Sequence, residues 1–142
     1  MPSEMTVHAT YAGGMRVTAT NGAHTLTTDY PLTPGEKAEG FRPMELILVA
    51  LAACAGSTVG LLLGRLKQPV QGLEVNVRAE RRDEHPTVFT AIAMEFVFQG
   101  AGLDRAAIER VIAQADETLC PVWALVKAST PITTSYRFME AG

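Results

Sequence analysis

The sequence contains few of the residues that signal several common classes of protein. It has two cysteines, Cys54 and Cys120, and no Cys-x-x-Cys pair. Its three histidines are scattered over predicted strands and a turn, so their spacing gives little support for a metal site. Gly13 and Gly14 open no helix, which excludes a glycine-rich phosphate loop. There is no basic run, and the formal net charge is −3, so nothing supports nucleic-acid binding.

Charge is also missing from the middle of the chain. No charged residue lies between Glu45 and Arg65, and Leu46 to Leu63 is an uninterrupted run of apolar and small residues. As a helix this run is roughly 27 Å long. Its length meets the lower threshold for a membrane span, but a helix that is apolar all round also suits a protein core. We favour the core, because the run is rich in small residues and no second span exists.

The length of 142 residues suits a single domain, 1–142. Burying the apolar helix on all sides is easier with a second subunit, so we expect an oligomer. The N-terminal stretch lacks the charged-then-apolar pattern of a signal peptide, which predicts a cytoplasmic location. Cytosolic cysteines rarely form permanent disulfides, so Cys54 and Cys120 are inert core residues, a redox pair, or unrelated.

Three short strands are predicted before the long helix. Alternating β-favouring residues and the Asn21-Gly22 hairpin signal indicate strands over Thr6–Tyr11, Met15–Ala19 and His24–Tyr30. Arg16 lies on the second of these strands, and from position alone it reads as a solvated charge. Pro43 suits the first turn of the long helix, which we expect to end near Gly64–Lys67.

The rest of the chain alternates strands and helices. We expect antiparallel strands over Leu73–Arg81 and Val88–Phe98, a helix capped by Asp104, a break near Thr118–Cys120, a short helix from Pro121, and a last strand over Thr133–Met139. Strand groups separated by helices, joined by hairpins rather than β-α-β crossovers, predict an α+β fold.

The two cysteines differ in their predicted surroundings. Cys120 precedes Pro121 at the N-terminus of the short helix, where a thiolate is favoured. Cys54 lies within a helix and gains no such help, and burial alone would raise its pKa. From these positions the two residues are best interpreted as small buried hydrophobes, while a cysteine–histidine nucleophile stays open.

Three segments resemble the OsmC/Ohr family of osmotically inducible and organic-hydroperoxide-resistance proteins. They are RPMELILVALAACAGSTVGLLLGRL, VNVRAERRDEHPTVFTAIAMEFVFQGAGLD and ETLCPVWALVKASTPITTSY, in the family's order. The resemblance runs from about Phe41 to Tyr136, and its specific marks are a helix with PMEL and AAC and a later CPV. The PMEL pattern is similar to that of a divergent branch.

The resemblance implies a fold, a partner and an activity. The fold is two small antiparallel sheets around a long buried central helix, in an intertwined homodimer. The activity is thiol-dependent reduction of organic hydroperoxides: Cys54 becomes a sulfenic acid, Cys120 resolves it as a disulfide, and an external thiol or dithiol reduces that disulfide. No metal, haem or flavin is needed, and neither nucleic acid nor membrane is an expected partner.

The resemblance also implies an arginine and a glutamate at the site. Arg16 is the matching arginine, which would hold Cys54 as a thiolate, with Arg42 as the second choice. The family's peroxidases have a glutamate ten residues before the cysteine, where this chain has Met44. Glu45 falls on the opposite side of the helix from Cys54, so it reads as a first-turn charge or an interface group. The alternative is a non-catalytic or weakly catalytic module that binds a small apolar or sulfur-containing ligand.

Overall fold

A computed structural model describes residues 3–139 of the chain. The chain forms two compact units, Met1–Ile47 and Leu48–Gly142, and we describe each by itself. That residues 1–142 make one domain stays a prediction. The fold is α+β as expected, with two small sheets and three α-helices in the described residues.

The first unit is a three-stranded antiparallel sheet. Its strands are β1 (His8–Tyr11), β2 (Val17–Thr20) and β3 (Thr25–Thr28), in the order β1-β2-β3. They are shorter than predicted, and Arg16 lies just before β2 rather than on a strand. In residues 3–47 no hydrophobic side chain is buried. A sheet of this size needs an apolar face packed against something else to be stable.

Helix α1 (Pro43–Arg65) has well-defined ends. At its start, the backbone N–H of Arg42 donates to the Glu45 carboxylate at 2.8 Å, which is half of a capping box. At its end, Lys67 adopts a left-handed conformation with φ 57°, and the N–H of Gln68 donates to the carbonyl of Leu63 at 3.0 Å. The uncharged run and its two flanks therefore predicted this helix closely.

The second unit is built on a mixed sheet. Its strands are β4 (Gly72–Arg81), β5 (Phe89–Gln99) and β6 (Ile132–Phe138), in the order β4-β5-β6. β4 and β5 are antiparallel as predicted, but β5 and β6 run parallel. The expectation of an antiparallel second sheet is wrong in this detail. A helical crossover connects β5 to β6, and such a connection allows parallel pairing.

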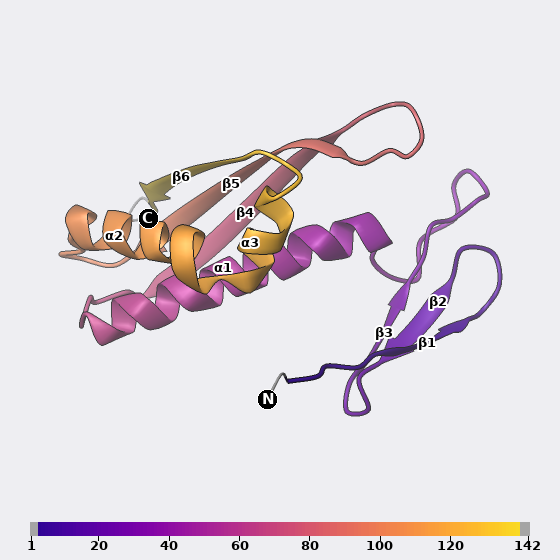
Figure 1. The fold of residues 1–142 in the computed structure, drawn as a ribbon, viewed down its shortest axis with the longest axis horizontal. Helices are drawn as coiled ribbons and strands as arrows, with labels where there is room; N and C mark the ends of the chain where they lie inside the picture. The colour runs from indigo at the N-terminus through magenta and orange to yellow at the C-terminus, as the bar shows by residue number, and fades with distance from the viewer. Residues whose placement is uncertain (1–2, 140–142) are drawn as a thin grey trace. The chain divides into compact units, whose positions relative to one another are not determined.

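All helices of the second unit pack on one face of this sheet (Figure 1). Besides α1 they are α2 (Arg105–Gln114), the π-helical turn η1 (Ala115–Leu119) and α3 (Pro121–Lys127). Asp104 caps α2 as predicted, because its side chain accepts the N–H of Ala106. The largest buried core side chains include Trp123, Phe96, Phe98, Leu51 and Leu63.

Only one stripe of α1 is buried within this chain. The stripe consists of Leu51, Ala55, Val59 and Leu63, all at 0% exposure. Beside it, small residues let the helix approach β4: a Cβ on Gly56 would lie 2.9 Å from Cγ2 of Val75. The sequence predicted a helix buried on all sides, so the rest of its apolar surface needs another cover.

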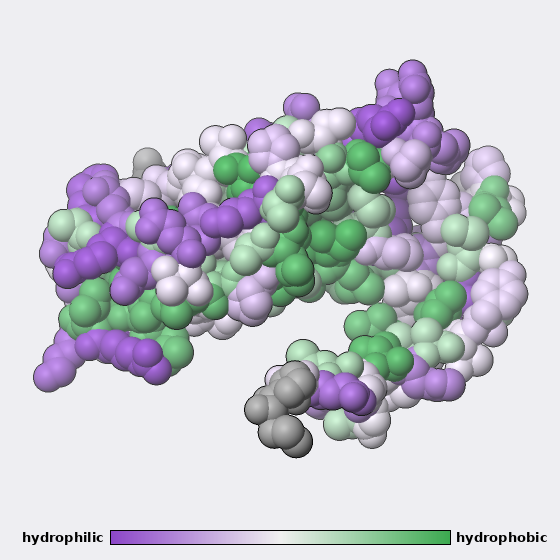
Figure 2. Space-filling model, viewed as in Figure 1, coloured by the Kyte–Doolittle hydropathy of each residue, from purple (hydrophilic) through white to green (hydrophobic). Residues whose placement is uncertain are grey.

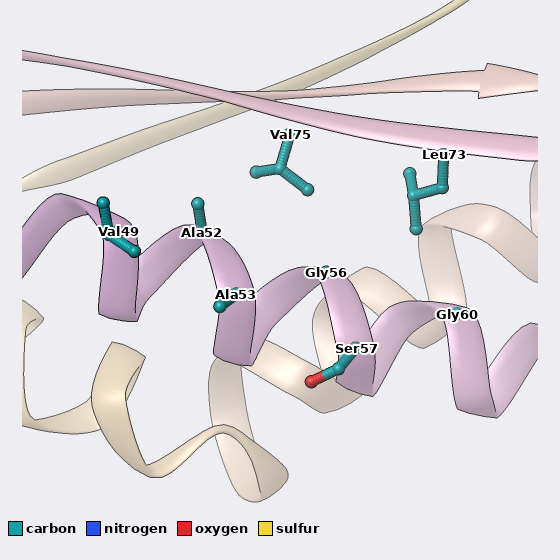
Figure 3. A pocket seen from close by; sticks show the side chains of 8 residues that line it. All are labelled: Val49, Ala52, Ala53, Gly56, Ser57, Gly60, Leu73 and Val75. Carbon is teal, nitrogen blue, oxygen red and sulfur yellow. The ribbon is translucent and has the colours of Figure 1, made fainter. Parts of the chain in front are cut away.

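An apolar groove of about 580 Å³ follows α1 and β4 (Figure 3). The lining residues are Val49, Ala52, Ala53, Gly56, Ser57, Gly60, Leu73 and Val75. The space-filling view shows hydrophobic residues gathered over α1 (Figure 2). In residues 3–139, α1 is the one helix long and apolar enough to cross a membrane by length and composition, and 22% of its most apolar window is buried. The core helix of a soluble protein can pass the same test.

Candidate functional site: a pair of thiols

The second unit brings the two cysteines of the sequence together. The sulfur atoms of Cys54 and Cys120, 66 residues apart in the chain, lie 2.9 Å from each other. Both are free thiols, with Cys54 half-buried and Cys120 buried. The fold therefore places the two sulfur atoms in direct contact.

Two different local structures hold the thiols. Cys54 lies in the middle of α1, one residue before the buried Ala55. Cys120 lies between η1 and α3, where its backbone is extended with φ −86° and ψ 106°. Its N–H donates to the carbonyl of Ala115 at 2.9 Å, and its carbonyl accepts the N–H of Ala124 at 3.1 Å. Cys120 therefore ends one helical segment and begins the next.

Cys120 is a protonated thiol at neutral pH. Burial, and then the hydrogen bond to Cys54, raise the pKa of Cys120 from an ordinary value of 9.0 to about 11. The amide groups of Trp123 and Val122 lower the pKa in part, but burial outweighs them. The expectation that the start of α3 favours a thiolate at Cys120 is therefore wrong, because a short helix offsets little of the cost of burying charge.

The pair has the geometry of a donor and an acceptor. The Cys120 thiol donates its hydrogen bond to the Cys54 sulfur. A disulfide bond is about 2.05 Å long, so the two sulfur atoms need to approach by about 0.9 Å to become bonded. The two thiols can therefore form a disulfide after a small movement.

Arg16 belongs to the first unit, and its contacts there are with Asp29. The guanidinium lies 3.5 Å from the Asp29 carboxylate, which also accepts the N–H groups of Glu39 and Tyr30, each at 2.9 Å. The Glu39 amide is the largest of the effects that lower the pKa of Asp29, and Arg16 adds to them. The Nε atom of Arg16 is buried without a hydrogen-bond partner. Its predicted role toward Cys54 stays a prediction.

The other charged residues considered at the start of α1 have structural contacts. Glu45 caps the helix through the Arg42 N–H, which fits its interpretation as a first-turn charge. The Arg42 guanidinium lies 4.4 Å from the centre of the Tyr30 ring, a cation–π distance. Glu45 thus caps α1, and the Arg42 side chain contacts Tyr30.

Two contacts of the segment that carries Cys120 were not predicted from the sequence. Lys127, at the end of α3, donates to both the backbone carbonyl and the carboxylate of Asp116, at 2.7 and 2.8 Å. Pro121 has no N–H, so it cannot donate to a carbonyl of the preceding helical turn. Its position in the sequence is the signal that could have suggested a side-chain donor to such a carbonyl. In residues 3–139 no group of three or more His, Cys, Asp and Glu side chains could hold a metal ion.

The fold and the site define a mixed α+β protein with two adjacent, part-buried thiols. The family model for OsmC-like proteins matches residues 35–135, and the chain belongs to the OsmC-like family. OsmC-like proteins are soluble.

Relatives and solved structures agree with this assignment. Protein YhfA of Escherichia coli K12 is 35% identical over 107 residues, which are 75% of this chain and 78% of YhfA. A hypothetical protein from Aquifex aeolicus VF5 has a similar structure, with a TM-score of 0.87, 23% identity, and coverage of 99% of this chain and 100% of its own. The organic hydroperoxide resistance protein OhrB of Bacillus subtilis has a TM-score of 0.63 at 21% identity, covering 95% and 98% of the two chains.

Proposed function

We propose that this protein is a thiol-dependent peroxidase that reduces organic hydroperoxides. The single observation that carries the proposal is the 2.9 Å separation between the Cys54 and Cys120 sulfur atoms. Membership of the OsmC-like family supports a role in peroxide resistance or stress. A structural neighbour named for organic hydroperoxide resistance supports the same class of substrate.

Cys54 is the proposed nucleophile, because Cys120 keeps its proton and donates to it. The Cys54 thiolate attacks one oxygen of the hydroperoxide, an S–O bond forms as the O–O bond breaks, and the alkoxide takes up a proton and leaves as an alcohol. Cys54 is then a sulfenic acid. The apolar side chains packed around the pair favour an organic peroxide over a small polar one.

Cys120 is the proposed resolving residue. Its sulfur attacks the Cys54 sulfenic sulfur, an S–S bond forms, and the S–O bond breaks. The proton of the Cys120 thiol leaves with the hydroxyl group as water. An external dithiol then reduces the Cys54–Cys120 disulfide by exchange and becomes oxidised itself. We propose no metal, haem or flavin in this cycle, and Arg16 as the cation that favours the Cys54 thiolate.

The test uses single cysteine variants with a dithiol reductant and an organic hydroperoxide. Cys54→Ser is expected to abolish turnover, while Cys120→Ser is expected to keep the first oxidation and accumulate a sulfenic acid that a dimedone probe labels. Arg16→Lys is expected to keep more activity than Arg16→Ala, since it retains the charge. Full turnover in Cys54→Ser would exclude the mechanism.

A second candidate function follows from the start of α1. Met44 stands where the family's peroxidases have a glutamate, and Glu45 uses its carboxylate to cap the helix. The groove beside α1, at about 580 Å³, has the size of a small-molecule site. A weakly catalytic or non-catalytic module for an apolar or sulfur-containing ligand would show slow peroxide turnover in stopped-flow measurements. A fast peroxidatic rate would exclude it.

The proposed partner is a second copy of this chain, in a cytoplasmic homodimer. The α1 surface leaves Leu61 at 58% and Val49 at 41% exposure, and residues 3–47 have no buried hydrophobic side chain. Apolar surface of this extent is typically covered by another protein surface. A second copy is the simplest occupant, because the family membership implies it and an apolar helix face can pack against its own symmetry mate.

A further inference from the structure

The backbone changes direction at Cys120 and leaves one carbonyl without its expected amide donor. In η1 the Cys120 N–H donates to Ala115, five residues earlier, as in a π-helix. The next carbonyl in this series belongs to Asp116, and the next residue after Cys120 is Pro121. Proline has no N–H, so it cannot supply a hydrogen bond to the Asp116 carbonyl.

Lys127 supplies the missing donor from the far side of Cys120. Its Nζ atom lies 2.7 Å from the Asp116 carbonyl oxygen and 2.8 Å from the Asp116 carboxylate. Lys127 is the last residue of α3, and Asp116 lies in η1. One side chain therefore joins the two segments that hold Cys120 between them.

The contact to the carbonyl matters more than the ion pair. The Lys127 and Asp116 side chains are 39% and 41% exposed, and ion pairs at that exposure stabilise a protein only slightly. A hydrogen bond from an ammonium group to a carbonyl that the helix leaves unpaired fixes the backbone itself. Its effect is expected on where Cys120 lies, rather than on overall stability alone.

We propose that Lys127 is a positioning residue for the Cys54–Cys120 pair, which it acts on by holding the η1–α3 junction where the Cys120 sulfur reaches Cys54. Reacting groups lose much of their advantage when they are displaced by about 1 Å, and the two sulfurs have about 0.9 Å to travel before they bond. Lys127 thus raises the effective concentration of Cys120 toward Cys54. The consequence of this for peroxide reduction rests on the proposed function.

The first test measures the thiol–disulfide equilibrium without peroxide. Wild-type protein and Lys127→Met are equilibrated in glutathione buffers of graded composition, and the Cys54–Cys120 disulfide is quantified by alkylation and mass spectrometry. In the variant, the effective concentration of the pair is expected to fall by about tenfold. Lys127→Arg, which keeps a donor, and Asp116→Asn, which keeps the carbonyl, are expected to stay near wild type. Lys37→Met removes an exposed lysine elsewhere and serves as the control.

Two results would overturn the proposal. One is an unchanged thiol–disulfide equilibrium in Lys127→Met, with the fold intact by circular dichroism. That result would show that Lys127 does not position Cys120. The other is an equal loss in Lys127→Arg and Lys127→Met, which would exclude a donor-based role. Because this measurement uses no peroxide, it can succeed even where the Cys54→Ser test rejects the peroxidase mechanism.

A second readout follows the lifetime of the sulfenic acid. In Lys127→Met the resolution step is expected to slow, so that a dimedone probe labels Cys54 several-fold more and excess peroxide converts more of it to sulfinic acid. The rate of the first oxidation is expected to stay unchanged, since Lys127 has no contact with Cys54 among the described hydrogen bonds. An equal slowing of both steps would contradict a positioning role confined to Cys120.

Discussion

Each sulfur of the pair has its own environment, and the proposed roles of the two cysteines follow from that difference. Cys120 is 2% exposed and donates to Cys54, which is half-buried within α1. A buried thiol that keeps its proton can stabilise a neighbouring thiolate and later give that proton to a leaving hydroxyl. The proposed assignment of Cys54 as nucleophile and Cys120 as resolving residue therefore depends on Cys120 keeping its proton.

The pKa of Cys120 has consequences that can be measured at high pH. The folded pKa is raised from 9.0 to about 11, so folded protein binds more protons than unfolded protein between these values. Stability is then fully present below pH 9.0 and falls as the pH rises toward about 11. Chemical denaturation of the reduced protein across this range is expected to show the loss, and Cys120→Ser is expected to lack it.

A Cys54→Ser variant separates the causes of that shift. Burial is the largest cause, so the pKa of Cys120 is expected to stay above 9.0 when the Cys54 sulfur is removed, and to fall below about 11. The ultraviolet absorbance of the thiolate reports it directly. A pKa at or below 9.0 in this variant would show that Cys54, and not burial, raises it.

Asp29 is expected to make the stability of the protein depend on pH in the opposite direction, at low pH. Its pKa is lowered from 3.8, first by the Glu39 amide, so its contribution to stability is present above pH 3.8 and is lost as the pH falls through the folded value. The amide chemical shifts of Glu39 and Tyr30, which donate to the carboxylate, are expected to titrate together with a midpoint below 3.8. In Asp29→Asn this titration is expected to disappear. A midpoint at or above 3.8 would contradict the pairing.

Among the elements, α1 carries a helix cap at its start and the Cys54 thiol in its middle. The Glu45 carboxylate accepts the Arg42 N–H at 2.8 Å, and the same helix carries Cys54 nine residues later. The capping hydrogen bond holds one oxygen of the Glu45 carboxylate at the start of the helix. Substitutions at Glu45 can distinguish its contribution to helix stability from any contribution to peroxide turnover.

Glu45→Gln keeps an acceptor and removes the charge. It is expected to leave both thermal stability and peroxide turnover near wild type, because glutamine also serves at this position of a capping box. Glu45→Ala removes the acceptor and is expected to destabilise the helix by about 1 kcal/mol. Thermal unfolding and steady-state kinetics check the two variants side by side. A large loss of turnover in Glu45→Gln, at unchanged stability, would assign Glu45 to the catalytic site.

Local patterns in the sequence predicted the helices and strands better than they predicted which strands pair with each other. The uncharged run located α1, the alternation of Leu73, Val75 and Val77 located β4, and Asp104 located the start of α2. The parallel pairing of β6 with β5 was not predictable, because alternation defines a strand's faces and not its neighbour.

The thiol site was predictable only in part for the same reason. Positions alone left Cys54 and Cys120 as two buried hydrophobes, and their expected pairing came from the family resemblance. Two residues 66 positions apart meet only when the whole second unit is folded. The rule for helix N-termini also gave the wrong direction for Cys120, because burial depends on tertiary packing. The Lys127–Asp116 contact depends on the π-helical turn, which no local pattern predicted.

At the scale of the whole molecule, apolar surface is left without a cover in this chain. The exposed part of α1 includes Leu61 and Val49, with Ala53 and Ser57 between them. Stable protein interfaces bury about 1,200–2,000 Å² in total, and a 23-residue helix supplies a large share of such an area. A homodimer through this surface would bury the helix that the sequence predicted to be fully enclosed.

A charge placed on α1 tests this arrangement. Ala53→Glu puts a carboxylate on the exposed side of the helix, where a monomer tolerates it but an apolar interface does not. Wild-type protein is expected to sediment at twice 15.2 kDa, and the variant is expected to dissociate at protein concentrations at least about tenfold higher than wild type. Gln114→Glu adds the same charge on the exposed surface of α2 and is expected to remain dimeric. If Ala53→Glu and Leu61→Glu both retain wild-type association in sedimentation equilibrium, α1 is not the interface between subunits.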